Sequence, residues 1–170
     1  MAYDAHTSAA AEITARCAVL TLSDTRTKET DTSGRRICEL LKAEGHTVLP
    51  YTIIRDDPVA LASLLDLYLR IRDADINVIL TNGGTGISRR DNTIAVVESK
   101  LTYSLPGFGE LFRMLSWNEI GSGALLSRAV GGVAGGKLIF AMPGSTKAVE
   151  LAMTKLILPE LRHLLFELRK

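Results

Sequence analysis

Apolar and polar segments alternate along the chain in a way that predicts strands followed by helices. Short apolar runs with strand character occupy residues 17–22, 47–54 and 76–81, and the stretches between them place apolar side chains at helical spacing. Two more strand candidates, at residues 129–133 and 137–142, are separated by glycines. Because strands that alternate with helices are typical of a parallel sheet covered by helices, the pattern predicts an α/β fold.

Typical cap residues bound the first two predicted helices. Asp31, Thr32 and Ser33 are alternative caps for the first helix, and Gly45 is its expected end. Pro58 suits the first turn of the second helix, because the N–H that proline lacks has no partner there.

Other prolines mark strand and helix boundaries. Pro50 inside a strand run predicts an edge strand or a bulge. A short helix is expected at residues 93–100. Residues 106–110 are expected to break the pattern before a helix at about residues 110–115, and Pro159 is expected to precede the last helix.

Length and composition predict one domain with no strong attraction to nucleic acid or membrane. The 170 residues contain no repeat or linker, so the domain is expected over residues 15–170, after a flexible tail at residues 1–14 that lacks the apolar core of a signal peptide. The net charge is +1, and no run approaches the roughly 18 apolar residues of a membrane helix. Cys17 and Cys38 are predicted to be buried free thiols, which fits a reducing cytoplasm.

Polar residues that could carry chemistry follow the predicted strands. They lie at residues 23–25, 56–57, 83–86 and 143–146, and we call residues 83–86 the glycine loop. In open parallel sheets, ligands bind outside the carboxyl ends of the strands. We therefore expect these four loops to meet at one edge of the sheet.

The glycine loop is typical of a phosphate-binding turn. Its backbone N–H groups can bind phosphate oxygens, Thr85 and Ser88 can add hydroxyl donors, and Arg89 or Arg90 can pair with a phosphate. The alternatives are a plain tight turn and arginines that only face solvent. Ser145 could cap its helix and add a second anion site, or serve as a cap alone.

Three carboxylates are expected near this loop. Asp56, Asp57 and Asp91 would repel a phosphate unless a cation lay between them, and Mg²⁺ is the usual solution. The alternatives are a turn before Pro58 for the first two and a helix cap for Asp91. Two common nucleotide-binding motifs are absent. Residues 131–137 have the glycine and lysine spacing of a P-loop but lead into a strand and lack the following Ser or Thr. Residues 83–86 do not match the glycine-rich fingerprint of dinucleotide-binding folds.

Five short motifs occur in order at suitable spacing, at residues 81–86, 89–91, 106–110, 126–128 and 142–145. Together they resemble the MoaB/MogA family of molybdenum cofactor biosynthesis proteins, from about residue 15 to the carboxyl terminus. Residues 23–26 and 31–34 are similar to the MoaB branch in particular.

The resemblance implies a three-layer α/β sandwich that binds molybdopterin, a pterin dithiolene with a terminal phosphate. Active members of the family adenylylate that phosphate with Mg-ATP and release pyrophosphate, and a partner enzyme then inserts molybdate. By position, Asp56 and Asp91 resemble the two functional aspartates and are the expected Mg²⁺ ligands. The family assembles as trimers, and the MoaB branch as hexamers. The expected substrate and nucleotide contacts are Ser23, Asn82, Gly83, Gly84, Thr85, Gly86, Ser88, Arg89, Arg90, Pro143, Gly144 and Ser145.

Three features of the sequence allow more than one interpretation. Many relatives carry a second proline where this chain has Thr146, which leaves the nucleotide contact there open. The function could be adenylyl transfer or the carrying of molybdopterin without transfer. The apolar residues between Phe108 and Trp117 could belong to the core or to a subunit contact.

Overall fold

A computed structural model describes residues 12–72 and 75–170. The strands are β1 (Arg16–Leu22), β2 (Thr47–Ile54), β3 (Val78–Asn82), β4 (Tyr103–Ser104), β5 (Val130–Ala134) and β6 (Lys137–Met142). The helices are α2 (Thr32–Ala43), α3 (Pro58–Arg70), α4 (Thr93–Lys100), α5 (Pro106–Ile120), α6 (Thr146–Ala152) and α7 (Leu158–Glu167), with a 3-10 helix η1 (Gly121–Leu126) after α5 and a π-helical turn η2 (Met153–Ile157) between α6 and α7.

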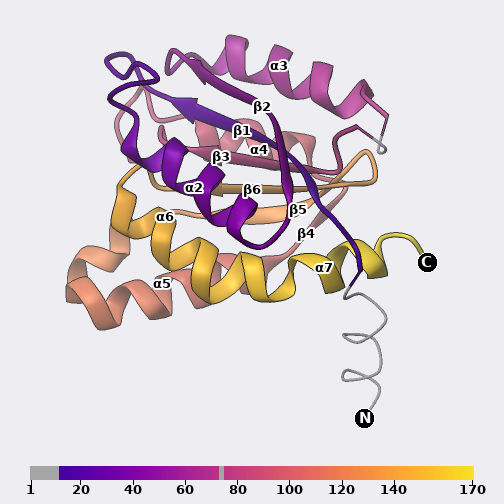
Figure 1. Ribbon diagram of the computed structural model, residues 1–170. Coiled ribbons are helices and arrows are strands. Elements are labelled where there is room, and N and C mark those ends of the chain that lie inside the picture. Colours follow the sequence, from indigo (N-terminus) through magenta and orange to yellow (C-terminus); the bar gives the residue numbers. More distant parts are fainter. Residues whose placement is uncertain (1–11, 73–74) are drawn as a thin grey trace.

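The strands form one six-stranded sheet in the order β2-β1-β3-β6-β5-β4. The first four strands in this order are parallel neighbours, and β5 and β4 complete the sheet by antiparallel pairing. Helices α2, α5, α6 and α7 cover one face and α3 and α4 cover the other (Figure 1). The predicted α/β fold with a mostly parallel sheet is therefore confirmed.

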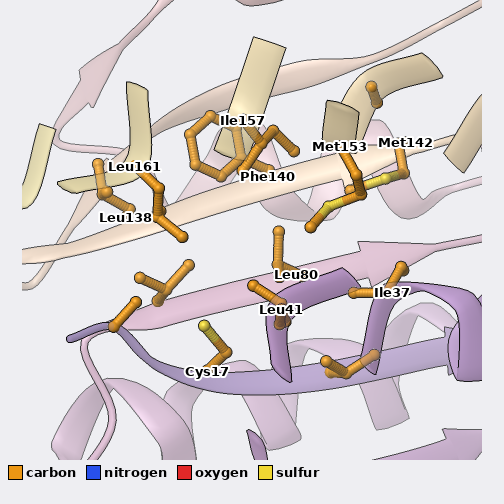
Figure 2. Packing of buried hydrophobic residues seen from close by; sticks show 14 of the residues in the cluster. Cys17, Ile37, Leu41, Leu80, Leu138, Phe140, Met142, Met153, Ile157 and Leu161 are labelled. Carbon is orange, nitrogen blue, oxygen red and sulfur yellow. The ribbon is translucent and has the colours of Figure 1, made fainter. Parts of the chain in front are cut away.

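Alternating side chains of the central strands supply two separate cores. Val19, Leu80 and Phe140 pack towards α2, α5, η2 and α7, and Figure 2 shows Leu80 and Phe140 on the side of Leu41 of α2 and Ile157 of η2. Their neighbours in sequence, including Leu20 and Ile139, point to α3 and α4. Both faces of these strands are buried, which explains why the strands are continuous apolar runs.

The expected caps and edge features are present. Asp31 is the cap of α2, and its side chain accepts a hydrogen bond from the backbone N–H of Gly34. Pro58 lies in the first turn of α3. Pro50 lies in β2, which is an edge strand, and the register shifts between Cys17 and Val19 opposite it. The two cysteines are buried free thiols, as predicted.

Three predicted boundaries are wrong. The segment at residues 106–110 does not break the pattern, because Pro106 occupies the first turn of α5, where proline is tolerated. Pro159 lies within a continuous run of helical turns, because the π-helical turn η2 precedes it without a break. The predicted tail ends too late, since Ile13 is buried and its carbonyl accepts a hydrogen bond from Arg162; residues 1–11 of that tail lie outside the described residues.

In the described part of the chain, no helix combines the length and apolar character that crossing a membrane requires. Some apolar residues of α5 belong to the core and others lie at the surface. Phe108 and Phe112 are buried in the core, whereas Leu111, Met114 and Trp117 are exposed.

Candidate functional site

The four loops predicted to meet do come together at the carboxyl ends of the parallel strands. The main chain of Asp56 donates a hydrogen bond to Asp24, which joins the loops after β2 and β1. The N–H of Gly83 donates to the carbonyl of Met142, which joins the loops after β3 and β6. Arg26 donates to the carbonyl of Gly144, which joins the loops after β1 and β6.

Asp56 lies directly against the glycine loop. A Cβ atom on Gly84 would lie 2.6 Å from Oδ1 of Asp56 and 2.3 Å from Oγ1 of Thr93, so a side chain here would displace one of them. The backbone of Gly84 also has φ of +62°, a conformation that glycine adopts at little cost. Glycine at this position therefore allows the carboxylate to approach the loop.

Asp91 approaches the same loop at Gly86. A Cβ atom on Gly86 would lie 2.6 Å from Oδ2 of Asp91, and that oxygen accepts a hydrogen bond of 2.8 Å from the N–H of Ser88. Two carboxylates from distant parts of the sequence thus contact the backbone of one four-residue loop.

The two carboxyl groups have pKa values shifted in opposite directions. Burial raises the pKa of Asp56, and the negative charges of Asp91 and Asp24 raise it further, although Arg90 opposes the shift. Hydrogen bonds from Ser88 hold the pKa of Asp91 below its usual range despite the cost of burial. Because like charges near one another raise a carboxyl pKa, this pair would be relieved by a cation between them.

The donor set suits a shared magnesium ion better than a closed metal site. Among residues 12–72 and 75–170, no group of three or more His, Cys, Asp or Glu side chains could hold a metal ion. Mg²⁺ is commonly held by one or two carboxylates together with phosphate oxygens and water. Asp56 and Asp91 fit that pattern, with the remaining ligands supplied by a bound substrate.

Gly83 brings the strand ends into close contact. It has φ of +96°, and a Cβ atom there would lie 2.3 Å from the carbonyl oxygen of Leu22. A Cβ atom on Gly144 would lie 3.1 Å from Cα of Gly83. The end of β3 is therefore held between the ends of β1 and β6.

The other residues predicted around the glycine loop differ in exposure. Thr85 is buried, whereas Ser88, Arg89 and Arg90 are exposed. Arg90 lies 3.7 Å from the Asp24 carboxylate with most of its side chain in solvent, so this ion pair contributes little to stability. Both arginines are free to reorient towards an anionic ligand.

Several predicted contact residues have their side chains engaged within the protein. Asn82 is fully buried beneath the loop, where its amide group donates to Leu20 and Thr21. The hydroxyl of Ser23 accepts from the main chain of Arg26, and that of Ser145 caps α6. Pro143 is partly exposed in the turn before Ser145.

Asp57 and Thr146 have local roles in this cluster. Asp57 caps α3 by accepting hydrogen bonds from Val59 and Ala60, which agrees with the alternative of a turn before Pro58. The hydroxyl of Thr146 lies 2.9 Å from that of Thr32. This hydrogen bond joins the starts of α6 and α2.

Sequence reasoning missed several residues that shape this site. Arg26 and Asp31 form an ion pair beside Gly144, and Arg128 donates to the carbonyl of Gly86. They all lie in motifs that carry the family resemblance, and Asp31 was also expected as a helix cap, but neither signal indicated these contacts. The buried hydroxyl of Thr93 has no hydrogen-bond partner among the described residues, although it lies beside Gly84.

The loop after β1 and strand β2 line an open hollow beside the site, and none of its lining residues belongs to the glycine loop or to residues 143–146. Its volume is about 500 Å³, within the range of small-molecule sites. It is lined in part by Ser23, Asp24, Arg26, Lys28 and Arg55, so cationic side chains outnumber the carboxylate there. A ligand with several negative charges would suit this neighbourhood.

The fold and the loops define a class of protein, namely an α/β protein with a candidate ligand site at the carboxyl ends of parallel strands, built on a glycine loop and two carboxylates. Residues 18–163 match a family model described as "Probable molybdopterin binding domain". The chain belongs to this family, in the MoaB branch of the MoaB/MogA molybdenum cofactor biosynthesis proteins.

Individual relatives agree with this assignment. Molybdenum cofactor biosynthesis protein B of Bacillus anthracis is 55% identical over 157 residues, which cover 91% of each chain. A crystal structure of a molybdenum cofactor biosynthesis protein B has a TM-score of 0.88 at 52% identity and covers 92% of this chain and 97% of its own. The tungsten cofactor synthesizing protein MoaB of Pyrococcus furiosus has a TM-score of 0.81 at 33% identity, covering 92% of this chain and 98% of its own.

Proposed function

We propose that this protein binds molybdopterin and transfers an adenylyl group from ATP to its terminal phosphate. The observation that carries the proposal is the approach of Asp56 and Asp91 to the same glycine loop. Family membership supports the pterin as ligand, and the two carboxylates support a step that uses a magnesium nucleotide.

The proposed reaction is a displacement at phosphorus. An oxygen of the molybdopterin phosphate attacks the α-phosphorus of ATP, and a new P–O bond forms. The bond between the α-phosphorus and the bridging oxygen breaks, and pyrophosphate leaves with the electron pair of that bond. Such transfers depend mostly on positioning and on neutralisation of charge.

Some residues of this chain would position the phosphates, and others would neutralise their charge. Backbone N–H groups of the glycine loop would hold a phosphate, and Arg89 or Arg90 would pair with its charge. Ser145 would contribute a substrate or nucleotide contact at the turn after β6. When bound, Mg²⁺ supplies neutralisation of phosphate charge, and Asp56 and Asp91 are the residues that would hold it.

The competing function is a carrier that binds molybdopterin without adenylylating it. The approach of both Asp56 and Asp91 to the glycine loop favours transfer, because a binder that needs no cation has no evident use for two Mg²⁺ ligands there. A pterin carrier would be better served by neutral hydrogen-bonding groups in that position.

Incubation with molybdopterin, ATP and Mg²⁺ separates the two functions. Adenylyl transfer predicts pyrophosphate release that depends on the pterin, together with an adenylylated pterin in chromatography. Pterin binding without pyrophosphate release would select the carrier. Absence of both would reject both functions.

The proposal also includes partners. The adenylylated product would pass to an enzyme that inserts the metal oxyanion, and the protein would act in the cytoplasm as a homo-oligomer, trimer or hexamer. The exposed apolar residues of α5 and η1 support self-association.

A further inference from the structure

A buried carboxylate lies behind the site at the start of α2. Asp31 is fully buried, and its Oδ1 accepts hydrogen bonds from the N–H of Gly34 and the hydroxyl of Ser33. Its Oδ2 accepts a hydrogen bond of 2.6 Å from the hydroxyl of Tyr51. Burial opposes ionisation of Asp31, but the hydrogen bonds it accepts outweigh that effect and hold its pKa below the usual range.

Arg26 connects this carboxylate to the turn after β6. Its Nη1 lies 3.4 Å from Oδ1 of Asp31 and 2.7 Å from the hydroxyl of Ser33. Its Nη2 donates a hydrogen bond of 2.9 Å to the carbonyl oxygen of Gly144. The planar guanidinium group therefore links α2 to the Gly144 turn, and lysine could not make these contacts together.

The same network reaches the end of β3. The hydroxyl of Ser33 lies 2.8 Å from Oδ1 of Asn82, which immediately precedes the glycine loop. Asp31 is thus connected, through Arg26 on one side and Ser33 on the other, to two of the loops that form the site.

Anchoring the Gly144 carbonyl has a consequence for the next N–H group. In a planar trans peptide, the carbonyl and the following N–H point in opposite directions. Holding the carbonyl of Gly144 therefore fixes the direction of the N–H of Ser145.

We propose that Arg26 and Asp31 are positioning residues for nucleotide binding and transfer. Asp31 fixes the guanidinium group, and Arg26 fixes the Gly144 turn against Gly83, so that backbone donors of the site face the phosphates in one orientation. This inference rests on the proposed function in naming the nucleotide as the ligand that is positioned.

The experiment compares Arg26→Ala, Arg26→Lys and Asp31→Asn with the unchanged protein. Arg36→Ala is the matched control, because Arg36 also bridges α2 and α6, through Glu150, but contacts none of the four loops. Positioning errors of about 1 Å can cost roughly a hundredfold in rate, so we expect Arg26→Ala to lower kcat for pyrophosphate release about ten- to hundredfold. Molybdopterin affinity should stay within about twofold, since the guanidinium group of Arg26 is already engaged by Asp31, Ser33 and Gly144.

Chemical rescue provides a readout that a merely structural role would not change. Millimolar guanidinium should restore part of the activity of Arg26→Ala, because Asp31, Ser33 and the Gly144 carbonyl remain to bind it. It should not restore Asp31→Asn, and it should leave the Arg36→Ala control unchanged. The activity of Arg26→Lys should be intermediate, because lysine keeps the positive charge but lacks the planar, forked donor group of arginine.

The outcomes separate this inference from the proposed function. If the unchanged protein releases no pyrophosphate, the proposed transfer fails, and the same variants are then compared by calorimetric ATP affinity with and without guanidinium. A folded Arg26→Ala that equals the control in kcat, in KM for ATP and in ATP affinity would overturn the positioning role. Failure of guanidinium to restore a folded Arg26→Ala would overturn it as well.

Discussion

Asp91 and Asp56 reach one glycine loop from different strand ends, and their surroundings shift their carboxyl pKa values in opposite directions. Asp91 is the carboxylate kept ionised by its hydrogen bonds from Ser88. A group that is ionised at all physiological pH values is suited to hold a cation.

Replacement of this carboxylate tests the proposed metal role. Asp91→Asn should leave molybdopterin binding largely intact, because the pterin does not require the ion, but should lower adenylylation at least about tenfold, or roughly 1.4 kcal/mol of barrier. Chromatography of the adenylylated pterin measures the rate. Full activity of the variant would reject the role, and Asp57→Asn, which changes only a helix cap, is the control.

We expect the Asp56 carboxylate to lower the stability of the fold while serving the proposed reaction. A raised carboxyl pKa means that folding disfavours the charged form, so stability is lost as pH rises from the ordinary value of 3.8 through the higher folded value. Above that folded value the full penalty is present. Asp56→Asn should therefore unfold at a higher temperature while losing transfer activity, and solvent screening limits the gain to about 1 kcal/mol or less in free energy of unfolding.

The pH dependence supplies the check on this prediction. The stability difference between Asp56→Asn and the unchanged protein should shrink as pH falls through the raised folded pKa and vanish below the ordinary value of 3.8, where Asp56 is protonated in both the folded and the unfolded state. Denaturant unfolding at neutral and acid pH measures it. A variant that is less stable at neutral pH would contradict the predicted penalty.

Individual residues were predictable where their chemistry is visible in the sequence. Asp56, Asp91 and the glycines follow strand runs, so the rule for the carboxyl ends of parallel strands is enough to place them together. Asp31 was expected only as a helix cap, and its contacts with Arg26 and Tyr51 join segments that no local pattern connects.

Among the strands and helices, the site depends on how closely β3 can approach its neighbours. Gly83→Ala should cost about 1–3 kcal/mol, because the Cβ would meet the Leu22 carbonyl and the backbone conformation disfavours side chains. Gly107→Ala is the matched control, since nothing lies within 4 Å of its Cβ and alanine favours α5 by about 0.5–1 kcal/mol. Denaturant unfolding compares the two, and equal effects would contradict the packing argument.

The strands and helices were predictable from the periodicity of the sequence, but the residues at which they begin and end were less predictable. The four parallel strands and the helices after them were predicted near their observed positions. The full length of α5 was not predicted, because Pro106 and two glycines are typical of a break and are accommodated by the first turn of the helix. The continuity through Pro159 depends on a π-helical turn, which periodicity does not indicate.

The molecule as a whole presents an apolar surface that the ligand site does not use. We define the α5 patch as the exposed apolar residues of α5 and η1, namely Leu111, Met114, Trp117, Ile120, Leu125 and Leu126. Each is at least 46% exposed, and clustered apolar exposure of this kind marks interaction sites. Sequence alone could not separate these residues from their buried neighbours Phe108 and Phe112.

We expect the α5 patch to lie in the subunit contact of the homo-oligomer. Trp117→Glu should shift the mass in light scattering at micromolar concentration towards the monomer, because a charge would be buried without a partner. Leu67→Glu on α3 is the control, since Leu67 is exposed on the opposite layer. An unchanged protein that is strictly monomeric would contradict the expectation.

Adenylyl transfer at the glycine loop is tested by following the α-phosphorus of ATP. With ATP labelled at that atom, molybdopterin and Mg²⁺, we predict that the label moves to the pterin while the released pyrophosphate stays unlabelled, and that Asp91→Asn slows the movement. A pterin that binds the protein but acquires no label would contradict adenylyl transfer at this site.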